Sequence, residues 1–244
     1  MKQLLILLVI ILFSSCQFTE TMVLNEDGSG TMTLGMDLTE MMAFGGDLSQ
    51  DSTFVKMDTI ISFKKLFEEK KDSIAKLSVE EQNKLLAMQN YNMRMQMDPE
   101  TGTTVMSVFT DFKNVNEAND LIKGFNQAEG IMPGTKATPK KEEGGPQPDI
   151  IGVSYSYENG KFKRDAFIKD KERHDVQMDS LKQAEAFMGG MKYTLKYTFP
   201  KRVVKSSAED AKLSMDGKTI EIERSFLEYF KNPDALDLEV ELEN

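Results

Sequence analysis

The feature that most constrains the fold is a series of short segments in which apolar and polar residues alternate. The clearest run is 191–199, where Met, Tyr, Leu, Tyr and Phe alternate with Lys and Thr. A period of two gives a strand one apolar and one polar face. Asp27-Gly28 and Asn159-Gly160 each stand between two such runs, and such turns are typical of β-hairpins. The chain is therefore expected to contain a hairpin-built sheet.

Strands and helices are predicted along most of the chain. The remaining segments that favour strands are 18–24, 32–38, 91–97, 103–112, 151–157, 162–168, the run around Ile220 and Ile222, and 236–242. Apolar residues recur at helical spacing in 63–77, 115–125 and 171–188, and Ser78 begins a capping box. Because each hairpin has one polar face, helices are needed on the other face only. We predict an α+β fold, an antiparallel sheet built of hairpins with amphipathic helices on one face.

The N-terminus has the features of an export signal. A short basic start precedes an unbroken apolar run over 4–13, which is too short to span a bilayer. Phe13-Ser14-Ser15-Cys16 then resembles the lipobox of bacterial lipoproteins, a family in which the chain is cut before the Cys and the Cys is acylated. This resemblance implies a signal peptide over 1–15 and a lipid anchor on Cys16. The alternative is an ordinary secretory signal with an incidental Cys.

The residue after the anchor indicates a destination. Gln17 is not Asp, and by the sorting rule of Gram-negative lipoproteins this implies the outer membrane, with the mature chain facing the periplasm. Residues 16–244 are expected to form one lipid-anchored α+β domain. Within it, 128–149 loses all periodicity and holds four of the seven prolines, so it is predicted to be a linker or a mobile loop.

Composition excludes several classes of function. The net charge of −10 argues against nucleic-acid binding, which needs a surplus of Lys and Arg. One Cys and one His leave no intramolecular disulfide and no Cys/His zinc site. Nucleophilic catalysis that needs an imidazole could use only His174, which lies among charged neighbours and is expected to be solvated. No cofactor and no catalytic residue is predicted.

Three further features have both a functional and a structural interpretation. The 17 methionines include Met93, Met95 and Met97 on one strand face and Met32 and Met36 on another. Thioethers can bind Cu(I), but Met also fills irregular cores and adaptable surfaces, which is the interpretation we favour. Segment 25–30 has the composition of a calcium loop without its spacing and is interpreted as a turn.

The last strand carries the third feature, a row of four carboxylates. This row could bind a cation, yet a straight strand rarely gathers calcium ligands. We interpret it as a solvated face, with like charges protecting a sheet edge. The four residues are Asp237, Glu239, Glu241 and Glu243.

The two ends of the chain resemble the LppM-like domain of bacterial lipoproteins. Residues 18–38 are similar to its opening hairpin, with the Asp27-Gly28 turn between alternating strands. Residues 191–224 are similar to its closing strands, through 197–200, 203–204 and the segment that begins at Asp216-Gly217. The resemblance covers about a quarter of the chain. It implies a non-catalytic envelope lipoprotein with an α+β domain and a pocket for lipid-like ligands.

Three functions remain open at this point. The first is a membrane-anchored binding module for an apolar or lipid-like ligand, which needs a cavity lined by Met, Phe and Leu. The second is a structural or assembly lipoprotein that docks to another envelope protein, which needs an exposed apolar patch or sheet edge. The third is an enzyme built on carboxylates alone, which needs two of them in one cleft. We favour the first.

Overall fold

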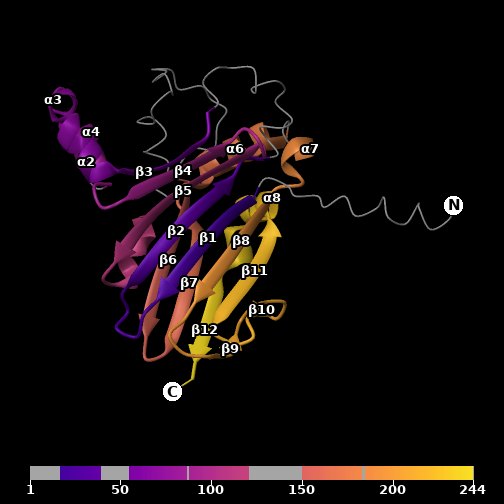
Figure 1. The fold of residues 1–244 in the computed structure, drawn as a ribbon. Coiled ribbons are helices and arrows are strands. Elements are labelled where there is room, and N and C mark those ends of the chain that lie inside the picture. Colours follow the sequence, from indigo (N-terminus) through magenta and orange to yellow (C-terminus); the bar gives the residue numbers. More distant parts are fainter. Residues whose placement is uncertain (1–16, 40–54, 87, 121–149, 183–184, 244) are drawn as a thin grey trace.

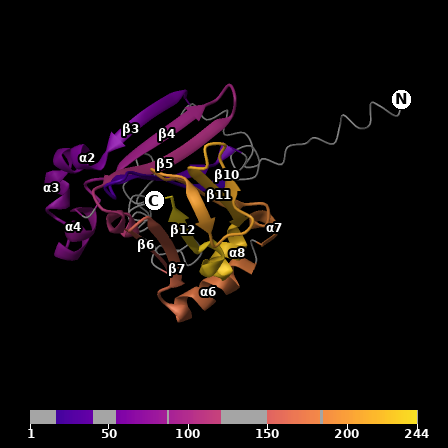
Figure 2. The same cartoon turned by 90° about the horizontal axis from the view of Figure 1, so that it is seen from below.

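The computed structural model describes residues 17–39, 55–86, 88–120, 150–182 and 185–243. Their strands form two sheets that pack face to face (Figures 1 and 2). The larger sheet has eight strands in the order β10-β11-β8-β1-β2-β5-β4-β3, and the smaller has four in the order β6-β7-β12-β9. Most of the buried apolar side chains lie between these two layers.

The strands of the larger sheet come from both halves of the chain. Their bounds are β1 Gln17–Leu24, β2 Gly30–Asp37, β3 Met57–Ser62, β4 Asn92–Asp98, β5 Thr103–Phe112, β8 Lys192–Thr198, β10 Lys212–Leu213 and β11 Thr219–Ser225. All neighbours pair antiparallel except β1 and β8, which run parallel from Gln17 opposite Lys192 to Val23 opposite Thr198. This parallel pair joins the strands that precede residue 120 to those that follow residue 150.

The smaller sheet is antiparallel throughout. Its strands are β6 Ile151–Glu158, β7 Lys161–Ile168, β9 Val203–Ser206 and β12 Leu238–Leu242. β12 lies between β7 and β9, so the last strand has partners on both sides. Alternation is clear in β7, where Phe162, Arg164 and Ala166 are buried and Lys161 and Lys163 are exposed. The buried set faces the larger sheet.

Short helices occupy one end of the two sheets and project as an arm beyond β3 (Figure 1). The arm follows β3 along the chain and begins with α2, whose Phe63 and Phe67 are buried. The helices are α2 Phe63–Glu69, α3 Lys71–Ile74, α4 Val79–Leu86, α6 Lys171–Leu181, α7 Glu185–Met188 and α8 Phe226–Lys231, with 3-10 turns η2 Val115–Asp120 and η5 Pro233–Leu236.

The glycine turns explain why the hairpins form where the sequence predicts them. Asn159 and Gly160 have φ values of 52° and 73°, the two positive angles that a type I′ turn needs. Gly28 and Gly217 have φ values of 81° and 70° in the turns before β2 and β11. Asn and Gly tolerate this region far better than other residues. The hairpins predicted at Asp27-Gly28 and at Asn159-Gly160 are confirmed.

The α+β class is confirmed, but the cover of the large sheet differs from our expectation. A second sheet, rather than helices alone, packs on its apolar face. The segment expected to be helical over 63–77 is broken into α2 and α3, and the start of the one expected over 115–125 is the 3-10 turn η2. β3, α8 and η5 were not expected from the sequence pattern. The predicted linker at 128–149 lies outside the described residues.

Candidate functional site

A buried ion pair lies between the two sheets. Glu20 occupies an inward position of β1, in the same phase as Met22 and Leu24, and its side chain is wholly buried. Arg164 faces it from β7 and is also wholly buried. The Arg164 Nε and Nη2 atoms each lie 3.1 Å from a different Glu20 carboxylate oxygen. This is a two-pronged guanidinium–carboxylate contact, the strongest geometry for such a pair.

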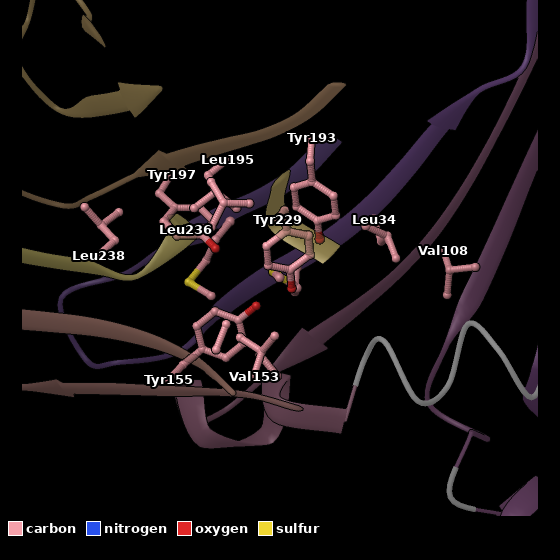
Figure 3. Packing of buried hydrophobic residues seen from close by; sticks show 14 of the residues in the cluster. Leu34, Val108, Val153, Tyr155, Tyr193, Leu195, Tyr197, Tyr229, Leu236 and Leu238 are labelled. Carbon is pink, nitrogen blue, oxygen red and sulfur yellow. The ribbon is translucent and has the colours of Figure 1, made fainter. Parts of the chain in front are cut away.

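Four tyrosines complete the polar cluster, and Figure 3 shows them gathered among the apolar side chains. Tyr155 and Tyr193 donate their hydroxyl protons to Glu20 over 2.6 Å, and Tyr197 also donates to it. Arg164 donates to the Leu236 carbonyl at 3.0 Å and to the Tyr229 hydroxyl oxygen at 3.3 Å. We call Glu20, Arg164 and the four tyrosines the Glu20 cluster.

The cluster keeps Glu20 ionised and its tyrosines neutral. Burial opposes ionisation of Glu20, but the charge of Arg164 and the donated hydrogen bonds outweigh it, so the Glu20 pKa lies below its ordinary value. Burial, followed by the nearby Glu20 charge, raises the pKa of Tyr155, Tyr193 and Tyr197 well above the ordinary tyrosine value. The charged atoms are enclosed by other side chains, so the arrangement joins the two sheets rather than presenting a reactive group.

This cluster was not predicted from the sequence. The sequence pattern that could have revealed it is a charged residue at a position where the alternation expects an apolar one. Glu20 stands in such a position of β1, and Arg164 in such a position of β7. A charge in such a position is buried only with a partner. The alternation was therefore informative, but which charge meets which depends on the packing of two sheets.

A second feature is a face of methionines on the large sheet. Register places Met36 of β2, Met106 of β5 and Met95 of β4 in one row across three strands, and Met97 beside Met57 of β3 in the next. All but Met106 are partly exposed. Among the described residues, the main neighbours of β3 and β4 are each other, β5 and α2, so this face extends beyond the two-sheet core. We call these five residues the methionine face.

The acidic row of the last strand is not at a sheet edge, so that part of our interpretation was wrong. β12 is an interior strand, and its carboxylates lie among lysines of β7 and β9. Glu241 lies 3.5 Å from Lys161 and 3.7 Å from Lys205, and Glu239 lies 3.8 Å from Lys163. A groove of about 480 Å³, lined mainly by charged and polar residues together with Phe162 and Val240, runs over these side chains. The lysines already compensate the carboxylates, which disfavours a cation there.

Asp237, at the start of the same row, has a structural partner. It accepts a hydrogen bond from the Ala166 amide at 2.8 Å, and partial burial raises its pKa. Asp27, in the loop that resembles a calcium site in composition, accepts bonds from the amide and hydroxyl of Ser29, as a turn residue does. Within the described residues, no three carboxylate, imidazole or thiol groups converge as a metal site would require.

The expectation that His174 is solvated was wrong. Its side chain is buried, its Nε2 lies 2.8 Å from the Phe230 carbonyl oxygen, and its ring stacks on that of Phe230. The cover comes from α8, which was not predicted. His174 therefore belongs to the contact between α6 and α8.

The predicted lipidation site, Cys16, lies outside the described residues, which begin at Gln17. Among the helices that the structure describes, none is both long and apolar enough to cross a membrane.

Comparison with known proteins gives one structural likeness. No protein-family model matches the chain, and no curated protein matches it. A search of solved structures finds the folded domain of the LppM protein of Mycobacterium tuberculosis, determined by NMR. The TM-score is 0.39 and the sequence identity 8%, over 93% of this chain and 89% of that chain. The likeness concerns the fold alone.

Proposed function

We propose that the chain is a non-catalytic lipoprotein of the cell envelope, anchored through Cys16 in the outer membrane, that binds an apolar, lipid-like ligand on the methionine face. The observation that carries the binding proposal is the register of β2, β5, β4 and β3, which collects methionines from four strands on one partly exposed surface. Methionine side chains are flexible and polarisable, so such a surface adapts to acyl chains of different shape.

The location of this face supports the proposal. Between the sheets, the space near β1 and β8 is filled by the Glu20 cluster and by Phe162, which packs against Tyr197 and Phe199 with ring centroids 5.5 and 5.2 Å apart. A ligand that entered there would have to displace a buried ion pair. Met36 and Met106 of the methionine face pack on this core, whereas Met57, Met95 and Met97 continue the face beyond it and are partly exposed. A ligand can contact these three without breaking the core.

The absence of a catalytic role is part of the proposal. Among the described residues, the groups whose pKa values lie well above their ordinary values are three tyrosines and Arg164 of the Glu20 cluster, and all four are buried and hydrogen-bonded to Glu20. A general acid or base needs contact with substrate in a cleft.

The ligand proposal is tested with residues 17–244, which include every described element. A fluorescent acyl-chain probe should bind saturably to this protein. Met95→Glu should weaken binding at least tenfold, because the introduced carboxylate would lie against the apolar acyl chain of the probe. Met215→Glu is the matched control, since Met215 is fully exposed at a distant turn. Absence of saturable binding by the folded wild-type protein would overturn the proposal.

The anchor is tested separately. Cys16→Ser should move the protein from the membrane fraction to the soluble fraction. A variant that still sediments with membranes and resists salt extraction would show that acylation of Cys16 is not what holds the chain there.

A second candidate function is docking to another envelope protein, and β3 favours it. β3 ends the strand order of the large sheet, and its central Ile60 is 60% exposed. The amide of Phe63 donates to the Tyr91 carbonyl at 3.1 Å, so by alternation the peptide groups of Ile60 point to the open edge. A photo-crosslinking residue at Ile60, but not at exposed Val176, should then trap a partner in cells.

A further inference from the structure

The first described residue is already part of the sheet. Gln17 begins β1 and pairs with Asp37 on one side and Lys192 on the other. Because Gln17 follows Cys16 directly, the Cα atoms of the two are only about 3.8 Å apart. The proposed acylation site is thus separated from the centre of an eight-stranded sheet by a single peptide bond.

The strand that begins there is held from both sides and from its inward face. Phe18 stacks on Phe226 of α8 with ring centroids 4.6 Å apart. Two residues later, Glu20 forms the buried ion pair with Arg164 of the smaller sheet. A strand with two neighbours and buried contacts of this kind does not behave as a flexible tether, unlike a Gly/Ser-rich spacer.

We infer that the protein stands upright on the bilayer, with the sheet end that carries Gln17 and Lys192 against the lipid headgroups. This inference rests on the proposed anchor at Cys16. The same end carries α7 and α8 (Figure 1), and two of its lysines are paired, Lys192 with Glu223 at 2.7 Å and Lys231 with Glu185 at 3.2 Å. The charges of these pairs compensate each other, so they do not repel the headgroups.

The opposite end is then directed away from the membrane. β1 spans eight residues, or about 25 Å at the usual rise of a strand. β8 runs parallel to it, and β9 and β10 follow at the far end, where Figure 1 also places the C-terminus. Met215, in the turn after β10, is fully exposed there.

The orientation is tested on the acylated full chain, reconstituted in vesicles of phosphatidylethanolamine and phosphatidylglycerol. Cys16 is the sole Cys and its thiol is acylated, so a Cys introduced at Lys192 or at Met215 can be labelled alone. Lipids with a nitroxide on the headgroup should quench a fluorophore at position 192 several-fold more than one at position 215. A ten-residue Gly-Ser spacer inserted between Cys16 and Gln17 should reduce that difference strongly.

The two proposals fail in different ways. Protein that does not float with the vesicles would contradict the lipid anchor itself. Protein that floats but shows equal quenching at the two positions, or quenching that the spacer leaves unchanged, would contradict the upright orientation and leave the anchor intact.

Discussion

Glu20 and Arg164 are 144 residues apart in the chain, yet their side chains form an ion pair that is wholly buried between two sheets. Removing one partner of such a pair leaves an uncompensated buried charge, which typically costs about 3–5 kcal/mol. Arg164→Met should therefore lower the free energy of unfolding by about that amount, measured by urea denaturation of residues 17–244.

The double variant separates charge from packing. Glu20→Leu combined with Arg164→Met removes both charges, so it should be more stable than Arg164→Met alone. The tyrosine hydroxyls lose their acceptor, so recovery is expected to be partial. A double variant at least as unstable as the single one would show that the ion pair is not what sets the cost.

Acid should weaken this cluster only at low pH. The Glu20 pKa is lowered in the folded chain, so its contribution to stability is complete above the unfolded-state value of about 4.3 and is lost as the pH falls through the lower folded value. Unfolding curves recorded from pH 7 to pH 2 should show this loss in the wild type. Glu20→Gln should lack it, and a curve of the same shape in that variant would assign the acid sensitivity to other carboxylates.

His174 should contribute to stability rather than to chemistry. Its ring nitrogen bonds the Phe230 carbonyl and its ring stacks on Phe230, so His174→Ala should cost about 1–3 kcal/mol in the free energy of unfolding. Val176→Ala is the control on the same helix, because Val176 is 68% exposed and should change stability by less than about 0.5 kcal/mol. Equal effects at the two positions would contradict the burial of His174.

The Asn159-Gly160 turn allows a test of backbone conformation alone. Gly160 has a φ of 73°, and an added Cβ would come no closer than 3.8 Å to its nearest neighbour, the Leu242 carbonyl oxygen. Gly160→Ala should therefore destabilise the protein by about 1–2 kcal/mol through strain without a clash. Gly35→Ala is the counterpart in a strand, where an added Cβ makes ordinary contact and φ is not positive. A Gly160→Ala variant as stable as wild type would contradict the left-handed turn.

Local patterns predicted the hairpins, since alternation and turn residues act over ten to twenty positions. They could not predict which hairpins meet. The last strand looked like a protected edge because the row from Asp237 to Glu243 is wholly acidic. The lysines that compensate Glu239 and Glu241 come from β7 and β9. β3 was missed because its exposed residues at an edge lack clear alternation. The methionines were noticed strand by strand, but only the register shows that Met36, Met106 and Met95 share one row.

The parallel pairing of β1 with β8 also has a consequence for biogenesis. Tyr193 of β8 donates a hydrogen bond to Glu20 of β1, and it is synthesised 173 residues after Glu20. During synthesis, β1 must therefore wait for most of the chain before its second edge is paired. Contacts of such long sequence separation slow folding, and an unpaired central strand invites wrong partners. The nascent chain should depend on a holding chaperone until β8 arrives.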